Sequence, residues 1–405
     1  MTREHADRTT DIGTDIRTDV LVVGGGIIGL AVAWRTAQRG LSVTVLDPDP
    51  GHGANQVAAG MLAPVTELQY GEEPLLRLGI ASNTRYADFV AELTEASGGL
   101  STGYRRCGTL AVALDADDRA ELREVHAFQQ RLGLTTEWLT GRECRRLEPM
   151  LAPDVRGGTL VAEDHQVDGR RLGAALVAAC ERAGVTLHRS RAATLAVTGD
   201  RAAGAVAEDG TRIAAGRTVL AAGSWSGELP GLPPEARLPV RPVKGQVLRL
   251  RMETVQGPLP MPFLSRNVRA VVRGCHIYVV PRENGELVLG ATSEEQGFDT
   301  TVTAGGVYEL LRDARELLPG ITELPLAETN AGLRPGTPDN APLLGPTALP
   351  DLIAATGHYR NGVLLTPVTG DAIAELLTTG SLPPEAAPFT PERFAAHRPV
   401  LETSR

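Results

Sequence analysis

A glycine-rich turn, Gly24-x-Gly26-x-x-Gly29, is the first segment of the sequence that could do chemistry. Gly24 permits a tight turn after an apolar segment, Gly26 lets the backbone approach a pyrophosphate, and Gly29 lets a helix lie against a sheet. The N–H groups at the start of that helix are then free to bind phosphate. Asp47 ends the next apolar segment, where it can accept hydrogen bonds from a ribose diol. The pattern predicts a dinucleotide site without separating FAD from NAD.

An arginine flanked by turn-forming residues is the second such feature, in Gly332-Leu333-Arg334-Pro335-Gly336. We expect a rigid, exposed turn here. The guanidinium fork of Arg334 could then bind a carboxylate through two parallel hydrogen bonds. The alternative is a surface arginine paired with a nearby acid, which is the commoner situation for an arginine considered alone.

A third polar segment, Gly357-His358-Tyr359-Arg360-Asn361-Gly362, falls between a predicted strand and a predicted helix. Its N–H groups could face an anion or a carbonyl-bearing ring, and Arg360 adds positive charge. His358 has the side chain of a general base, but a lone histidine is more often a structural one.

Two segments rich in small residues would let the backbone lie close to a bulky planar group. They are Val57-Ala58-Ala59-Gly60-Met61 and Val219-Leu220-Ala221-Ala222-Gly223-Ser224-Trp225. Considered alone, the first is more simply a flexible surface loop. The second is equally well an ordinary core strand and its turn.

The elements that must position these segments begin with a β-α-β unit. Residues 19–23 and 42–46 are predicted strands, and residues 26–39 are a predicted helix between them. A further strand-turn-helix covers residues 352–377, with its strand at 352–355 and its helix at 362–377. A sheet that begins near the N-terminus and is completed near the C-terminus implies a discontinuous domain with a second domain inserted. Other predicted helices are 73–95, 118–133, 140–147, 168–183 (with Asp168 as N-cap) and 307–318, and other predicted strands are 186–188, 193–197, 201–207, 211–213, 218–220, 240–251, 268–281 and 286–291.

The predicted fold class is therefore α/β (α+β overall), with a Rossmann-like nucleotide-binding domain and an inserted, mainly antiparallel β substrate domain. We place the nucleotide-binding domain at residues 18–80, 150–235 and 325–385. The substrate domain takes residues 81–149 and 236–324, and residues 1–17 form a flexible tail.

Composition excludes several classes of protein. The chain has 405 residues and a formal net charge of -9, which argues against a nucleic-acid surface. Its four cysteines have no zinc-type spacing, so we expect no metal site, and they suit the reducing cytoplasm. No apolar run reaches the roughly 20 residues that span a bilayer, and the polar N-terminus does not resemble a signal peptide.

Taken together, the segments resemble the glycine oxidases, within the D-amino-acid oxidase and sarcosine oxidase group of flavoproteins. The resemblance runs from about residue 18 to residue 377. It rests on Val22–Gly29, Ala58–Met61, Pro242–Gln246, Tyr278–Arg282, Ala331–Thr337 and Gly357–Gly362.

The resemblance implies non-covalent FAD at the junction of the two domains, because the sequence has no cysteine after Cys275 where sarcosine oxidases attach their flavin. It assigns Arg334 to the substrate carboxylate, adds the hydroxyl of Tyr278, and turns Arg360 toward the substrate as well. The implied cofactor-binding residues are Gly24, Gly26, Ile27, Ile28 and Gly29 at the pyrophosphate, Asp47 and Pro48 at the ribose, Ala193 at the adenine, and Ala54, Asn55, Ala59, Gly60, Met61, His358, Tyr359, Arg360, Asn361, Gly362, Val363 and Leu364 around the flavin. Gly223, in the second of the segments rich in small residues, is a further predicted cofactor-binding residue.

The resemblance also implies the reaction: glycine is oxidised to the imine, which hydrolyses to glyoxylate and ammonia, while dioxygen becomes hydrogen peroxide. Sarcosine and small D-amino acids are implied as further substrates of the same oxidation. The imine would supply the thiazole of thiamine, and relatives are often homotetramers. The alternatives are a D-amino-acid dehydrogenase with another electron acceptor, an oxidase of N-methylated amino acids, an NAD-dependent dehydrogenase and a non-catalytic dinucleotide-binding protein. Arg266, Arg269 and Arg273 are expected to be solvated charges, or else to draw anions to the pocket entrance.

Overall fold

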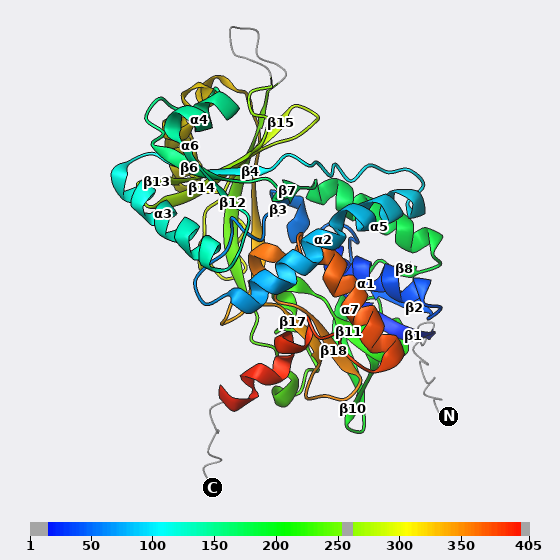
Figure 1. The fold of residues 1–405 in the computed structure, drawn as a ribbon. Coiled ribbons are helices and arrows are strands. Elements are labelled where there is room, and N and C mark those ends of the chain that lie inside the picture. The colour runs from blue at the N-terminus through cyan, green and yellow to red at the C-terminus, as the bar shows by residue number, and fades with distance from the viewer. Residues whose placement is uncertain (1–14, 253–261, 398–405) are drawn as a thin grey trace, which may run out of the picture.

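Two eight-stranded sheets organise the computed structural model, which describes residues 15–252 and 262–397 (Figure 1). The first sheet has the order β17-β18-β11-β1-β2-β8, and β9 and β10 extend it beyond β11. The pairs from β18 to β8 are parallel. Its strands are β1 (Ile16–Val23), β2 (Val43–Leu46), β8 (Thr186–His188), β9 (Ala192–Thr198), β10 (Arg201–Ala207), β11 (Arg212–Leu220), β17 (Leu343–Pro346) and β18 (Leu352–Thr356).

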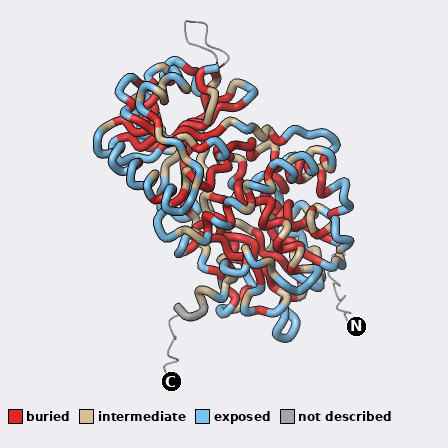
Figure 2. The backbone as a smooth tube through the Cα atoms, viewed as in Figure 1, coloured by how far each residue is buried: buried red, intermediate tan, exposed pale blue. Residues whose placement is uncertain are grey.

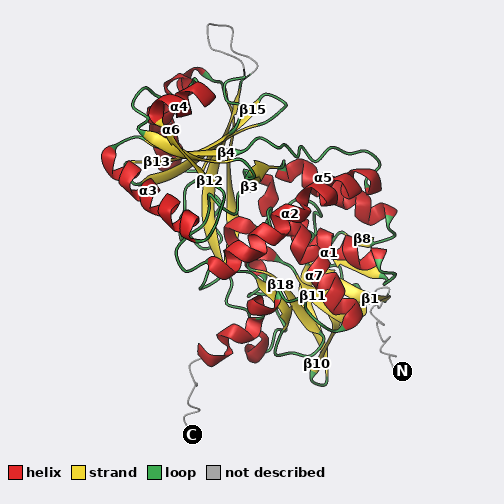
Figure 3. Ribbon diagram, viewed as in Figure 1, coloured by secondary structure: helices red, strands yellow, loops and turns green. Residues whose placement is uncertain are grey.

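Alternation along β1 buries both faces of this sheet. Val20 and Val22 pack among the helices, whereas Leu21 and Val23 join the core on the opposite face. The helical face is covered by α1 (Ile27–Gln38), α2 (Glu73–Ala96), α5 (Gly169–Arg182) and α7 (Thr366–Thr379), which pack on one another (Figures 1 and 3). A strand with apolar residues on both faces is typical of a parallel sheet inside an α/β domain.

The second sheet has the order β16-β12-β15-β14-β13-β4-β6-β5 and is antiparallel except between β13 and β4. Its strands are β4 (Thr109–Ala113), β5 (Glu137–Thr140), β6 (Gly157–Val161), β12 (Arg241–Arg251), β13 (Asn267–Val272), β14 (Cys275–Pro281), β15 (Glu286–Gly290) and β16 (Leu326–Gly336). Helices α3 (Ala116–Arg131), α4 (Gly141–Leu147) and α6 (Ala304–Leu317) lie beside it. Figure 2 shows that buried stretches of the backbone gather in the interior and exposed ones on the outside. A short pair, β3 (Met61–Leu62) with β7 (His165–Gln166), completes the strands.

Most predicted elements are present, with ends that agree to within three residues. Asp168 caps α5 as predicted, because its Oδ1 accepts hydrogen bonds from the backbone N–H groups of Arg170 (2.9 Å) and Arg171 (3.2 Å). Three predictions were wrong. Residues 211–213 and 218–220 belong to the single strand β11, residues 268–281 form a hairpin of two strands that turns at Gly274, and α7 begins at Thr366 instead of residue 362.

Two strands and one helix do not follow the predicted domain boundaries. β6 and β16 pair within the second sheet, although residues 150–235 and 325–385 were expected in the nucleotide domain. The boundary at residue 80 falls inside α2, which stays continuous to Ala96 and packs on α5 and α7. Hydrogen bonding between strands outweighs proximity in sequence here, so the exact division into domains stays a prediction.

At the ends of the chain, residues 1–14 of the predicted tail lie outside the described residues. Ile16 and Arg17 were predicted to belong to that tail, but they pair with Ile213 and Ala214 as the start of β1. Within residues 15–252 and 262–397, no helix is both long enough and apolar enough to span a bilayer.

Candidate active site

A pocket of about 900 Å³ runs between the two sheets. One end is lined by the carboxyl ends of β1, β2 and β11, and the other by side chains of β12, β14 and β16. The volume lies at the upper end of the range for small-molecule and cofactor sites, as a dinucleotide requires. A crevice at the carboxyl ends of parallel strands is also where ligands bind in α/β sheets.

The glycine turn shapes the first end of this pocket. Gly24 has φ 108°, and a Cβ there would overlap the backbone of Ala221. A Cβ on Gly29 would overlap the carbonyl of Gly24, so Gly29 holds α1 against β1. Gly26 has nothing within 4 Å of the position a Cβ would take, and no side chain caps the N-terminus of α1. The first N–H groups of α1 therefore face open space suited to a phosphate.

Asp47 braces the same turn. Its Oδ2 accepts a hydrogen bond from the N–H of Gly25 (2.7 Å), and its Oδ1 accepts one from the N–H of Asp49 (2.8 Å). Both oxygens keep further lone pairs, and the residue lines the pocket. Asp47 therefore positions the phosphate turn in addition to its predicted role at the ribose.

The 54–61 loop crosses the middle of the pocket, and guanidinium groups hold its carbonyls. Arg170 and Arg249 donate to the carbonyl of Gln56 at 3.0 and 3.1 Å. Arg282 donates to the carbonyl of Ala59 at 2.6 Å and to that of Val167 at 2.9 Å. Burial lowers the pKa of Arg282 to about 10, which leaves it protonated at neutral pH. The loop is a fixed wall, contrary to the simplest expectation of a flexible surface segment.

Asn55 and Gly60 fit this wall in different ways. The buried side chain of Asn55 donates to the carbonyls of Gly51 (3.0 Å) and Gly169 (2.9 Å), so its amide organises the loop itself. Gly60 has φ 68°, and a Cβ there would overlap the carbonyl of Val167. The small residues of the loop thus allow a close approach of backbone to backbone beside the pocket.

The segment 357–365 forms the opposite wall of the pocket. His358 is 2% exposed, and its Nε2 lies 3.0 Å from Oγ1 of Thr369. Burial lowers the pKa of His358 to about 3, so the ring is neutral and structural, as a lone histidine usually is. From α2, Tyr86 and Ser82 donate to the carbonyls of Val363 (3.0 Å) and Leu364 (2.6 Å), which fixes the segment beside the pocket.

The substrate end of the pocket is built on the second sheet. Arg334 on β16 and Tyr278 on β14 are separated by β12 and β15. A Cβ on Gly245 of β12 would overlap the guanidinium of Arg334, and a Cβ on Gly290 of β15 would overlap the ring of Tyr278. Each large side chain therefore lies across a glycine of the neighbouring strand, and both line the same pocket.

Arg334 has a different environment from the one predicted. It lies in β16, opposite Val243 and half-buried, and not on an exposed turn. Its Nη1 donates to the carbonyls of Lys244 (3.3 Å) and Thr292 (3.1 Å). Among the residues that the structure describes, no carboxylate lies within 4.0 Å of this guanidinium. Its charge is therefore available to an anionic ligand.

Tyr278 lies close enough to Arg334 to sense its charge. Burial raises the pKa of Tyr278, with the Arg334 guanidinium acting in the opposite direction. The hydroxyl is thus protonated at neutral pH and can donate a hydrogen bond beside the guanidinium.

Arg360, in contrast, is paired with acids. Its Nη2 lies 3.2 Å from Oε2 of Glu72, and its Nε lies 3.8 Å from Oε2 of Glu67. Glu67 also forms an ion pair with Arg269, with 2.7 Å between Oε1 of Glu67 and Nη1 of Arg269. Arg269 and Arg266 were expected to be solvated, but both are partly buried in ion pairs, whereas Arg273 is exposed beside Glu316. Sequence reasoning missed Glu67 because it lies in a loop without periodicity or a motif.

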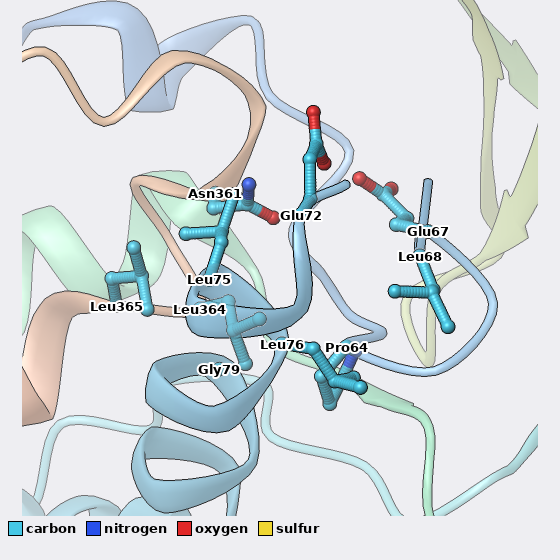
Figure 4. A pocket seen from close by; sticks show the side chains of 10 residues that line it. All are labelled: Pro64, Glu67, Leu68, Glu72, Leu75, Leu76, Gly79, Asn361, Leu364 and Leu365. Carbon is cyan, nitrogen blue, oxygen red and sulfur yellow. The ribbon is translucent and has the colours of Figure 1, made fainter. Parts of the chain in front are cut away.

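Beside these acids lies a second, smaller cavity of about 20 Å³, room for one water molecule. Its floor is apolar, and Figure 4 shows the carboxylates of Glu67 and Glu72 on one side of Leu75, Leu76 and Leu364. Asn361 and Leu364, predicted to contact the flavin, line this cavity and not the large pocket.

The large pocket brings together most of the predicted site residues. Gly29, Asn361 and Leu364 are the three that do not line it. Those that do are Gly24, Gly26, Ile27, Ile28, Asp47, Pro48, Ala54, Asn55, Ala59, Gly60, Met61, Ala193, Gly223, Tyr278, Arg334, His358, Tyr359, Arg360, Gly362 and Val363.

A parallel sheet with a glycine phosphate turn, joined to an antiparallel sheet that presents an arginine without a carboxylate partner among the described residues, is the arrangement of a dinucleotide-dependent oxidoreductase. Comparison with known families agrees. The FAD-dependent oxidoreductase family model (DAO) matches residues 19–376, and the chain belongs to this family. FAD is thus its cofactor, which rules out the NAD-dependent alternative.

Similar proteins refine the family. The bifunctional protein ThiO/ThiG of Synechocystis is 38% identical over 95% of this chain and 55% of its own length. The chain spans about half the length of the ThiO/ThiG relatives it matches. A glycine oxidase of Geobacillus kaustophilus is 34% identical over 92% of this chain and 96% of its own. The crystal structure of a glycine oxidase from that organism has a TM-score of 0.83 at 33% identity, covering 93% of this chain and 98% of that one.

Proposed function

We propose that the protein is an FAD-dependent oxidase that converts glycine, with sarcosine and small D-amino acids as further substrates, to the imine and then to glyoxylate and ammonia. The observation that carries the proposal is Arg334, half-buried in the pocket of an FAD-dependent oxidoreductase with no carboxylate partner among the described residues. The names of the relatives at 34–38% identity support glycine as the substrate and thiamine synthesis as the context.

The chain's own residues would bind and orient the substrate. The Arg334 fork binds the substrate carboxylate, and the protonated hydroxyl of Tyr278 donates a second kind of hydrogen bond to it. These two contacts would orient the α-carbon of the substrate toward the wall formed by the 54–61 loop and the 357–365 segment. Bound FAD supplies the hydride acceptor and, through its reoxidation by dioxygen, the hydrogen peroxide.

No side chain of the pocket is required as a base. His358 is buried and neutral, with its ring committed to Thr369. Positioning and the charge of Arg334 would provide most of the catalysis. Arg360, predicted to face the substrate, shares its charge with Glu72 and Glu67, so we assign it to the pocket wall.

A substrate panel read by peroxide tests the proposal. The FAD-loaded protein is mixed with glycine, sarcosine and D-alanine, and the flavin absorbance is recorded first without and then with dioxygen. We expect bleaching by glycine without dioxygen, followed by recovery with peroxide release. Bleaching that air does not reverse would indicate a dehydrogenase instead. Faster turnover of sarcosine than of glycine would indicate an N-methyl amino acid oxidase. No bleaching with any of the three would refute the proposal and favour a non-catalytic binding protein.

We further propose that FAD is bound non-covalently and that the enzyme works in the cytoplasm as a homo-oligomer, with a tetramer as the expected form. In the described residues no cysteine lines the large pocket, and all four thiols are free, which supports the first two points. Acid precipitation should release all the flavin, and sedimentation should give the mass of the assembly.

A further inference from the structure

We propose that Glu67 sets the charge of substrate that the pocket accepts. By neutralising Arg269 and part of Arg360, it leaves Arg334 as the one uncompensated guanidinium at the substrate end, within the described part of the chain. The pocket would therefore select amines with one carboxylate over amines with two. This inference rests on the proposed function, because it concerns how the same pocket discriminates among carboxylate-bearing amines.

The geometry of Glu67 is that of a shared counter-ion. Its two carboxylate oxygens face different guanidinium groups, with Oε1 at 2.7 Å from Nη1 of Arg269 and Oε2 at 3.8 Å from Nε of Arg360. The three side chains are only 15%, 22% and 25% exposed, so solvent screens their charges weakly. All three line the large pocket.

Arg269 lies where a second substrate carboxylate would find it. It is the cross-strand partner of Tyr278, on the strand next to the one that carries the tyrosine. Directly opposed residues of an antiparallel pair have Cβ atoms about 4.5–5.5 Å apart, so a freed Arg269 would stand beside the proposed substrate hydroxyl contact. Its other contact among the described side chains is Sδ of Met61 at 3.9 Å, which carries no charge.

The loop that carries Glu67 is held by hydrogen bonds between buried side chains and the two residues before it. The buried carboxylate of Asp164 accepts hydrogen bonds from the N–H and the hydroxyl of Thr66, both at 2.8 Å. The buried amide of Gln129 donates to the carbonyl of Val65 at 2.9 Å. A counter-ion held by such a scaffold is preorganised, in contrast to a surface acid that finds an arginine by chance.

The charges around the substrate end support one carboxylate and no more. Arg334, Arg269 and Arg360 are positive, and Glu67 and Glu72 are negative, so this group of five carries one net positive charge. Loss of the Glu67 charge would leave Arg269 without a carboxylate, while Arg360 would keep Glu72 at 3.2 Å. The pocket would then hold two available cations.

The test compares glycine with iminodiacetate, which is glycine with a second carboxymethyl group on its nitrogen. The readout is the ratio of kcat/KM for iminodiacetate to that for glycine. Glu67→Gln should raise this ratio by about tenfold or more, the size expected for one partly buried charge pair. Glu67→Asp, which keeps the charge, should leave the ratio closer to that of the unmodified protein. The double variant Glu67→Gln with Arg269→Gln should lose the gain.

The matched control is Glu385→Gln. Glu385 forms an ion pair of 2.6 Å with Arg85, and neither residue lines the large pocket. This substitution should not change the ratio. Flavin content and melting temperature are recorded for every variant. If Glu67→Gln does not retain FAD, Glu72→Gln unpairs Arg360 from its nearer acid and should shift the ratio in the same direction.

A binding measurement separates this inference from the proposed function. Acetate and malonate, a mono- and a dicarboxylate, are titrated against the flavin spectrum, which requires no turnover. Glu67→Gln should tighten malonate relative to acetate even if glycine is not the natural substrate. An unchanged malonate preference and an unchanged kcat/KM ratio, in a variant that binds FAD, would overturn the role of Glu67. Failure of the unmodified protein to be reduced by glycine would count only against the proposed function.

Discussion

Replacing Arg334 with alanine is the most direct test of the substrate end. The guanidinium has two backbone contacts, to the carbonyls of Lys244 and Thr292, and no carboxylate partner among the described residues. Removing one partner of a buried, hydrogen-bonded charge pair costs about 2–5 kcal/mol. We expect the lower half of this range, because the carboxylate that loses its partner is on the substrate, which can stay in water.

A loss of about 2–3 kcal/mol corresponds to a dissociation constant roughly 30- to 150-fold higher, since about 1.4 kcal/mol is tenfold. The assay is anaerobic stopped-flow reduction of the flavin at increasing glycine concentration, which separates apparent affinity from the limiting rate. Arg334→Lys keeps the charge but loses the fork, so it should recover part of the affinity. An alanine variant that binds FAD and has unchanged affinity for glycine would remove Arg334 from the substrate site.

Three further predictions concern neighbouring positions. Gly245→Ala should weaken glycine binding almost as much as Arg334→Ala, because the added Cβ would occupy the place of the Arg334 guanidinium. The same stopped-flow titration measures this, and an affinity for glycine equal to that of the unmodified protein would contradict it. Gly60→Ala adds a Cβ against the carbonyl of Val167 at a positive φ, so the purified protein should retain much less FAD, as measured by flavin-to-protein absorbance. His358 should make the fold acid-sensitive, because its pKa is about 3 when folded and about 6.5 when unfolded. Above about pH 6.5 the ring is neutral in both states and costs no stability, whereas the free energy of unfolding falls by up to about 1.4 kcal/mol per pH unit as the pH drops toward 3. His358→Gln should therefore reduce the pH dependence of the unfolding free energy, measured with urea between about pH 3 and 6.5. An equal slope against pH in both proteins would contradict the assignment.

The nucleotide-binding half was largely predictable from sequence because its signals are local. The turn at Gly24, the periodicity of α1 and the cap at Asp168 each depend on residues within one or two turns of chain. The family match over residues 19–376 confirms the fold class. The strand β16 was missed for an equally local reason, since Arg334-Pro335-Gly336 has the composition of a turn. β16 lies at the edge of its sheet, where a proline costs no ladder hydrogen bond on the open side.

The substrate end was predicted only through resemblance, because its geometry is not local. Arg334 and Tyr278 come together through the register of four strands and through the absence of a Cβ at Gly245 and Gly290. A single sequence does not show that a glycine makes room for a side chain on another strand. The clustering of Glu67 with two arginines was invisible for the same reason.

The order of strands in the first sheet also bears on how the protein is made. β1 lies between β2 and β11, and β11 pairs with β18, so β1 gains its second neighbour only when residues 212–220 have been made, and β11 gains β18 only when residues 352–356 have been made. During synthesis the first β-α-β unit leaves the ribosome with both faces of β1 apolar and only β2 beside it. The sheet closes after residue 356 has emerged, and the 357–365 wall follows still later. Pairing over such long separations is slow and exposes apolar surface meanwhile. We therefore expect the nascent protein to expose apolar surface until residues 352–356 have been made, and FAD to stabilise only a chain that includes the 357–365 segment.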